Sequence, residues 1–270
     1  MSSRMTYELT DQPVLENVAS SPASESRWIV RQLSLPQVIL FHLLPGLLIT
    51  CAFIAIAALM NRSALPASLA LLTTWLVVGL PLELGILLYQ GWRHNGHFSF
   101  NQIVLYREPL RFRQYLWLVP GLLIWTAISS TLFIPWTDSL RQALFPWWPS
   151  WLLLSNFVQN MSRYSSSVLW AMVILSFVLN IAIPIIEELY FRGFLLPRMA
   201  RWGNWAPLIS VLLFSLYHFW LPWENPTRII ALLPLVYAVR WKRNIYLGIA
   251  VHCLLNTIGS IGLLILVLNH

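Results

Sequence analysis

Long apolar runs separated by short polar segments dominate this chain from residue 37 onwards. A helix needs about 20 apolar residues to cross a bilayer. The pattern therefore predicts an all-α bundle of seven or eight membrane-spanning helices. Helix-compatible sequence continues past the fourth run, and the sixth run is short. The runs cover residues 37–60, 65–89, 114–134, 167–186, 205–220, 227–239 and 245–268.

The polar segments divide the chain into three parts. Residues 1–36 are rich in Ser and Pro and lack helical or strand periodicity, which predicts a disordered tail. They do not form a signal peptide, because the apolar run starts too late and no small-residue cleavage site closes it. Residues 37–165 should hold the first membrane helices and, over 135–165, an interfacial segment rich in Trp. Residues 166–270 form the third part.

Composition excludes two other classes of protein. Hydrophobic residues make up 58% of the chain and charged residues only 10%, whereas soluble domains carry roughly 25% charged residues. A wholly disordered chain is excluded as well, because such chains contain little apolar surface. Cys51 and Cys253 lie in separate apolar runs and are interpreted as packing residues. Neither a disulfide framework nor a cysteine-based zinc site is expected.

The basic residues predict how the protein is oriented. There are 17 basic and 10 acidic residues, but no basic stripe or motif of a nucleic-acid-binding protein accompanies them. We therefore expect a lipid bilayer, and not nucleic acid, as the partner. Cytoplasmic loops are enriched in Lys and Arg, which favours a cytoplasmic tail in a multi-pass protein of the plasma or cytoplasmic membrane. Only four basic residues then fall outside: Arg62, Arg141, Arg163 and Arg228.

Two adjacent acids in the fourth run are the most costly charges of the predicted membrane region. A charge at mid-bilayer costs about 2.5–3.5 kcal/mol on insertion scales. Glu188 and Arg192 are four residues apart and can pair on one helix face. Glu187 points about 100° away, and its neighbour four residues on is Phe191. A carboxyl without a local counterion in an apolar setting is a candidate general base or acid.

Other polar residues lie in the neighbouring runs. His218 stands near a helix end and close to Trp220, which alone is typical of an interface residue. His252 and Asn256 share one helix face, so they form either a contact between helices or a site. Glu83 is interpreted as a hydrogen-bonded packing residue.

Helix lengths bring some of these residues to one depth. If the chain turns at Gly203, Glu187 and His218 are 16 and 15 residues from the turn, which is about 23 Å along each helix. An antiparallel hairpin then places them level with each other. Counted from the loop 240–244, His252 and Asn256 are shallower. A tilted or broken helix is needed to bring all four side chains together.

Three motifs occur in order within the last runs. They are Glu-Glu-x-x-x-Arg, Phe-x-x-x-His and His-x-x-x-Asn, and the acids are followed by Phe191-Arg192-Gly193. This combination resembles the CAAX protease and bacteriocin-processing family of intramembrane glutamic endopeptidases, also called Abi proteins. The resemblance covers roughly residues 167–260 and identifies 166–270 as a catalytic membrane core. The preceding residues match only in being hydrophobic.

The resemblance implies hydrolysis of a peptide bond inside the membrane. It implies as catalytic residues Glu187, His218, His252 and Asn256. Glu187 would activate the attacking water with help from His218, and the other two would bind the water or stabilise the oxyanion. Glu188 and Arg192 would brace the site. The cavity would open to the cytoplasm, and the substrate would be a prenylated CAAX-type protein or another membrane-associated peptide.

Three other interpretations stay open. The Glu, two His and Asn would make a tolerable zinc site, but no His-Glu-x-x-His is present and the family is viewed as metal-independent, so we expect no cofactor. The chain could be a non-catalytic scaffold or immunity-type protein with the same fold. It could also be a proton-coupled carrier that uses Glu83, although no internal repeat of the kind found in transporters is visible.

Overall fold

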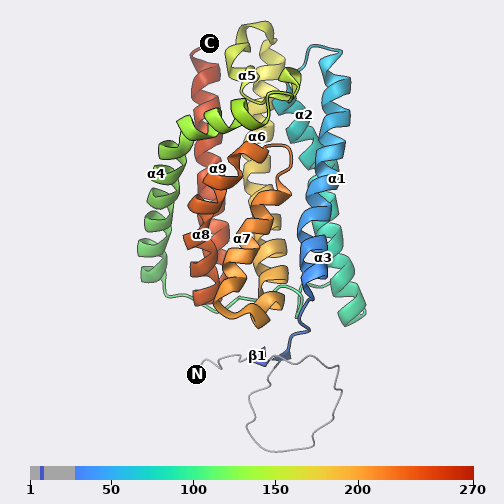
Figure 1. The fold of residues 1–270 in the computed structure, drawn as a ribbon, viewed down its shortest axis with the longest axis vertical. Coiled ribbons are helices and arrows are strands. Elements are labelled where there is room, and N and C mark those ends of the chain that lie inside the picture. The colour runs from blue at the N-terminus through green and yellow to red at the C-terminus, as the bar shows by residue number, and fades with distance from the viewer. Residues whose placement is uncertain (1–6, 9–27) are drawn as a thin grey trace, which may run out of the picture.

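The computed structural model describes residues 7–8 and 28–270, and most of the described chain is helical (Figure 1). Two short strands, β1 (Tyr7–Glu8) and β2 (Trp28–Ile29), pair in parallel. A π-helical turn joins α2 to α3. The helices are α1 (Leu35–Asn61), α2 (Ala67–Thr74), α3 (Leu80–Asn95), α4 (Phe112–Leu144), α5 (Asn156–Gln159), α6 (Ser166–Glu187), α7 (Ala206–Tyr217), α8 (Asn225–Lys242) and α9 (Ile245–Leu268).

The predicted apolar runs lie on helices apart from residues 65–66 and 218–220, which confirms the all-α fold class. Within the described residues, five continuous helical stretches are long and apolar enough to cross a membrane. The longest, Ser166–Tyr217, reverses at Gly203, whose φ of 53° lies in the left-handed region. α7 therefore runs back towards the middle of the bundle (Figure 1). The number of crossings and their orientation stay predictions.

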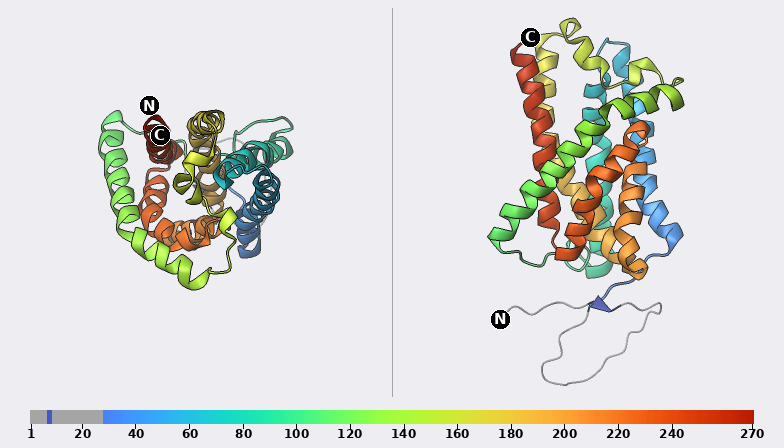
Figure 2. Two further views of the ribbon diagram at one scale, coloured as in Figure 1. Left: turned by 90° about the horizontal axis from the view of Figure 1, so that it is seen from above. Right: turned by 60° about the vertical axis from the view of Figure 1, so that its left-hand side comes forward.

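The α4 helix is longer than its apolar run. It continues past residue 134 and through Pro135 to Leu144, so the predicted interfacial segment begins as helix. Seen from the end of the bundle, α4 lies around the outside of α8 and α9 (Figure 2). A 2.9 Å hydrogen bond between the hydroxyls of Thr137 and Thr227 helps to hold this extension against the start of α8. Polar contacts of this kind extend the helix where hydrophobicity no longer signals it.

The predicted disordered tail, residues 1–36, lies largely outside the described residues. Its last described part is ordered against the segment that precedes α7. The side-chain amide of Gln32 donates to the carbonyl of Pro197 at 3.3 Å, and the amide of Leu33 donates to the carbonyl of Arg198 at 3.0 Å. The tail is therefore tied to the bundle just before α1 begins.

The closest approach of α1 to α7 occurs at a glycine. An added Cβ at Gly46 would overlap the carbonyl oxygen of Tyr217. Because that oxygen belongs to the backbone, Gly46→Ala must push the two helices apart, and we expect a loss of about 1–3 kcal/mol of stability. Thermal unfolding of the purified protein in detergent measures this loss. Gly85→Ala on α3 is the matched control, since nothing lies within 4 Å of its added Cβ; equal losses in both variants would contradict the prediction.

Candidate active site

The two adjacent acids lie where the α6 helix changes its winding. α6 ends at Glu187, and π-helical turns follow over Glu188–Leu195. π-Helical turns are rare in proteins overall, but those that occur are often found at functional sites. The side chains of both acids are almost fully buried, at 2% and 0% exposure. Burial of two neighbouring carboxyls is costly unless other groups compensate it.

Glu188 is compensated by a cation and an imidazole. A guanidinium nitrogen of Arg192 lies 3.4 Å from its Oε1, which is the pair predicted from the spacing. His252 donates from Nδ1 to the same oxygen at 3.1 Å. The guanidinium also lies 4.0 Å from the centroid of the Phe214 ring, where a cation–π contact adds to its stabilisation. The Arg192 guanidinium and the His252 imidazole thus contact the same oxygen of Glu188.

Gly248 is a site residue that the sequence analysis missed. An added Cβ there would overlap the Glu188 carboxylate, so α9 can approach the acids only because this position lacks a side chain. The spacing of Gly248 could have identified it from the sequence, because it precedes His252 by four residues on the same helix face. Small residues at such positions allow close helix packing in membranes.

Glu187 faces two histidines. Its Oε1 lies 4.0 Å from Nε2 of His218, and its Oε2 lies 3.8 Å from Nε2 of His252. Each ring is anchored through the other nitrogen. His218 donates from Nδ1 to the Phe214 carbonyl at 2.8 Å, and His252 donates to Glu188. In the neutral rings these bonds leave both Nε2 lone pairs directed at Glu187.

The depth of His252 follows from contacts with the loop between α3 and α4. Leu105 donates to the carbonyl of Gly193 at 2.8 Å, and Ile245 donates to the carbonyl of Tyr106 at 2.7 Å. Gly193 and Ile245 are therefore level. Glu187 precedes Gly193 by six residues and His252 follows Ile245 by seven. Glu187 and His252 therefore lie at the same depth in the bundle. The sequence required a tilted or broken helix to bring these side chains together. The break is the stretch of π-helical and 3₁₀-helical turns from Glu188 to Trp205.

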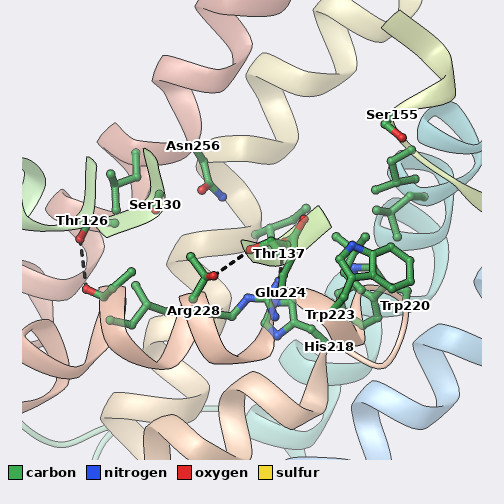
Figure 3. Close-up of a pocket in the computed structure, with 18 of the residues that line it drawn as sticks. Thr126, Ser130, Thr137, Ser155, His218, Trp220, Trp223, Glu224, Arg228 and Asn256 are labelled. Atoms are coloured by element: carbon green, nitrogen blue, oxygen red, sulfur yellow. Dashed lines mark hydrogen bonds and ion pairs between the residues drawn. The ribbon is translucent and has the colours of Figure 1, made fainter. Parts of the chain in front are cut away.

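Asn256 lies one turn beyond His252 on α9. Its backbone carbonyl accepts a 3.2 Å hydrogen bond from the amide of Asn180 on α6. No hydrogen bond of the Asn256 side chain occurs among the described residues. Instead, that amide lines the same cavity as Glu187 (Figure 3). The structure thus brings Glu187, His218 and His252 into one cluster and places Asn256 on the wall beside it.

The cavity above Glu187 has a volume of about 730 Å³. It is lined by residues of α2, α4, α6, α7, α8 and α9 and by the segment between α7 and α8. Figure 3 shows Arg228 reaching from α8 towards Glu224 and His218. Polar lining residues further from Glu187 include Thr137, Asp138, Arg141, Glu224 and Arg228, and three indoles also line it: Trp75, Trp220 and Trp223. Such a mixed lining suits a polypeptide better than a purely apolar chain.

The cavity extends towards one end of the bundle. Its lining reaches Asp138 and Arg141, near the end of α4, and Ser155, next to α5. The loops rich in Arg lie at the other end, where α3 and α8 end. The sequence led us to expect a cytoplasmic tail and a cavity open to the cytoplasm. These two expectations therefore cannot both hold.

Glu83 has a buried partner. The hydroxyl of Tyr217 donates to its Oε1 at 2.6 Å, and both side chains are fully buried. This contact agrees with the interpretation of Glu83 as a hydrogen-bonded packing residue, and it identifies the partner that the sequence could not. The other carboxyl oxygen has no hydrogen-bond partner among the described residues.

The Glu83 pair supports a stability prediction. Tyr217→Phe leaves the buried carboxyl without a donor, which costs about 1–3 kcal/mol. Glu83→Gln keeps a carbonyl oxygen for the same hydroxyl, so we expect a smaller loss. Thermal unfolding in detergent compares the two variants. If Tyr217→Phe were as stable as the wild type, the hydrogen bond would contribute nothing to folding.

The described part of the chain contains no preformed metal site. No group of three or more His, Cys, Asp or Glu side chains there is placed to hold a metal ion. Glu187 and its two histidines come nearest, with separations of 3.8–4.0 Å between their polar atoms. Metal independence stays a prediction.

Comparison with known proteins yields one match. Residues 168–258 match the family model described as type II CAAX prenyl endopeptidase Rce1-like. The match begins on α6, ends on α9 and contains all three motifs. Searches of curated proteins and of solved structures found no match. Over residues 168–258, the chain is therefore similar to the CAAX protease family that its motifs indicated.

Proposed function

We propose that this protein is an intramembrane endopeptidase in which Glu187 activates the attacking water. The observation that carries the proposal is the convergence of three acceptors at the floor of a cavity with a mixed polar and apolar lining. The Glu187 carboxylate and the Nε2 atoms of His218 and His252 face one another at 3.8–4.0 Å. These separations are too long for direct hydrogen bonds, and a water molecule that bridges such groups satisfies them instead.

The first step uses these acceptors together. A water molecule between them donates one hydrogen to Glu187 and the other to an imidazole Nε2. Glu187 takes the proton while the water oxygen bonds to the carbonyl carbon of the peptide. A carboxylate shielded from bulk solvent is a stronger base than one in water. The Asn256 amide, which needs no added proton to donate, stabilises the developing oxyanion.

The second step returns the proton. The tetrahedral intermediate collapses, the carbon–nitrogen bond breaks, and the leaving amine receives the proton held by Glu187. One water is consumed, and one carboxyl and one amine are formed. Glu188 and Arg192 act as positioning residues, because the Glu188 carboxylate accepts from Nδ1 of His252 and so orients Nε2 towards Glu187.

A cleavage assay tests the proposed function. The purified protein is incubated in detergent with a prenylated CAAX peptide and a library of membrane peptides, with and without chelator, in water enriched in oxygen-18. Mass spectrometry should find one heavy oxygen in the new carboxyl terminus at equal rates in both conditions. Loss of cleavage on chelation would replace the glutamate mechanism with a metal-dependent one that uses the same side chains. No cleavage of any peptide by folded protein would favour the non-catalytic scaffold.

A further inference from the structure

The cavity over Glu187 and the basic loops occupy opposite ends of the molecule. The floor is formed by Glu187, His218 and His252, and the lining reaches to Asp138 and Ser155 near α5. The C-terminus of the chain lies at this same end (Figure 1). We call the end that carries α5 the mouth end, and the end where α3 and α8 finish the basic end.

The basic end carries most of the positive charge. Contacts across it show that its loops are neighbours, since Arg107 pairs with Asn244 in an antiparallel bridge and Arg240 donates to the side chain of Asn204 at 3.2 Å. The basic residues on these described loops and the adjoining helix ends are Arg93, Arg107, Arg111, Arg113, Arg198, Arg201, Arg240, Lys242 and Arg243. Short loops rich in Lys and Arg remain in the cytoplasm when a membrane protein inserts.

A second cavity at the basic end agrees with this orientation. It has a volume of about 460 Å³ and lies between α1, α3 and the segment before α7. Its basic lining residues are Arg31, Arg93, His94 and Arg198, and no acidic side chain lines it. The other lining residues include the apolar side chains of Leu33, Phe41, Ile103 and Phe194. Basic pockets between membrane helices on the cytoplasmic side suit anionic lipid headgroups, and anionic lipids are enriched in the cytoplasmic leaflet.

We infer that the cavity over Glu187 opens on the non-cytoplasmic face of the membrane and receives its substrate from there. The substrate class is an extracytoplasmic polypeptide: a secreted peptide, or the segment of a membrane protein that follows its span on that side. That such a polypeptide is a substrate rests on the proposed function. The orientation itself rests on the charges and the cavity alone.

The chemistry of the cavity wall fits such a substrate. Arg228 and Glu224 form a 3.0 Å ion pair within it, and Thr137 and Thr227 share a hydrogen bond nearby. Ionised groups of both signs require water at the wall. A hydrated peptide can therefore enter from the aqueous face at the mouth end. The carboxyl terminus of a cytoplasmic protein would have to cross the layer of helices below Glu187.

Cysteine labelling in intact cells tests the orientation without requiring proteolysis. Cys51 and Cys253 are first replaced by alanine. Asp138→Cys and Ser155→Cys then report on the mouth end, and His94→Cys and Lys242→Cys are the matched reporters for the basic end. A membrane-impermeant maleimide should label the first pair in intact cells and the second pair only after permeabilisation. The opposite pattern, or equal labelling of both pairs in intact cells, overturns the inference.

A fusion supplies a second measurement if a cysteine variant does not fold. Alkaline phosphatase joined after His270 is active only outside the cytoplasm, whereas green fluorescent protein joined there is fluorescent only inside. We expect active phosphatase and no fluorescence; the reverse overturns the orientation.

The substrate side is tested separately with protein of known orientation. A library of membrane-impermeant peptides is supplied outside intact cells that express the wild type or Glu187→Gln. Cleavage by the wild type alone supports the inference. If the peptides are cleaved only when they are supplied inside, the inference fails and the proposed function stands. If the orientation is as inferred but the protein cleaves nothing on either side or in detergent, the proposed function fails instead.

Discussion

Glu187→Gln is expected to lower kcat for peptide cleavage by about 10²–10⁴-fold, because the variant loses the general base. The amide keeps the shape of the carboxyl and its oxygen can still accept a hydrogen bond, but it cannot take a proton from water. KM should change little, since Glu187 lies at the floor of the cavity and acts on the water. Steady-state rates of the purified variant, measured on the peptide that the wild type cleaves best, check this expectation.

A matched variant distinguishes the loss of the general base from the loss of any buried carboxyl. Glu83→Gln removes a carboxyl that is equally inaccessible and is bonded to Tyr217. If Glu83 is a packing residue, this variant keeps most of the activity. Undiminished cleavage by Glu187→Gln would remove Glu187 from the mechanism. A large loss in Glu83→Gln, with normal thermal unfolding, would instead give Glu83 a direct role.

Arg192→Met is expected to destabilise the protein by about 3–5 kcal/mol, the range measured when one partner of a buried ion pair is removed. The side chain of Arg192 is 1% exposed and that of Glu188 is fully buried. Without the guanidinium, the Glu188 carboxylate keeps only the hydrogen bond from His252 among the described residues. Chemical unfolding in detergent measures the loss, and kcat should fall because the Glu188 carboxylate that orients His252 is no longer held in place by the guanidinium.

The double variant Glu188→Gln/Arg192→Met is the control for this prediction. Removal of both charges leaves no unpaired ion, so the double variant should be more stable than Arg192→Met. The amide oxygen introduced by Glu188→Gln can still accept a hydrogen bond from His252, and part of the activity should return with the stability. If the double variant were no more stable than Arg192→Met, lost packing of the long Arg192 side chain would explain the effect.

The local features of this protein were predictable from its sequence. Apolar runs of about 20 residues are helical inside lipid, because a single segment can satisfy all of its backbone hydrogen bonds internally only as a helix. The pairing of Glu188 with Arg192 followed from their four-residue spacing alone. The three motifs followed from residue order, and the family match over residues 168–258 agrees with them. The separate direction of Glu187 also followed from helix geometry.

The meeting of distant segments depended on the tertiary structure. The count from Gly203 treated residues 188–203 as a regular helix, whereas they wind as π and 3₁₀ turns, and contacts with the α3–α4 loop determine the height of His252. Tyr217 and Glu83 are 134 positions apart, and no periodicity links them. The direction of the cavity depends on how short α7 and α8 are beside their neighbours. Periodicity acts within one helix, whereas packing between helices decides which side chains from different helices share a site.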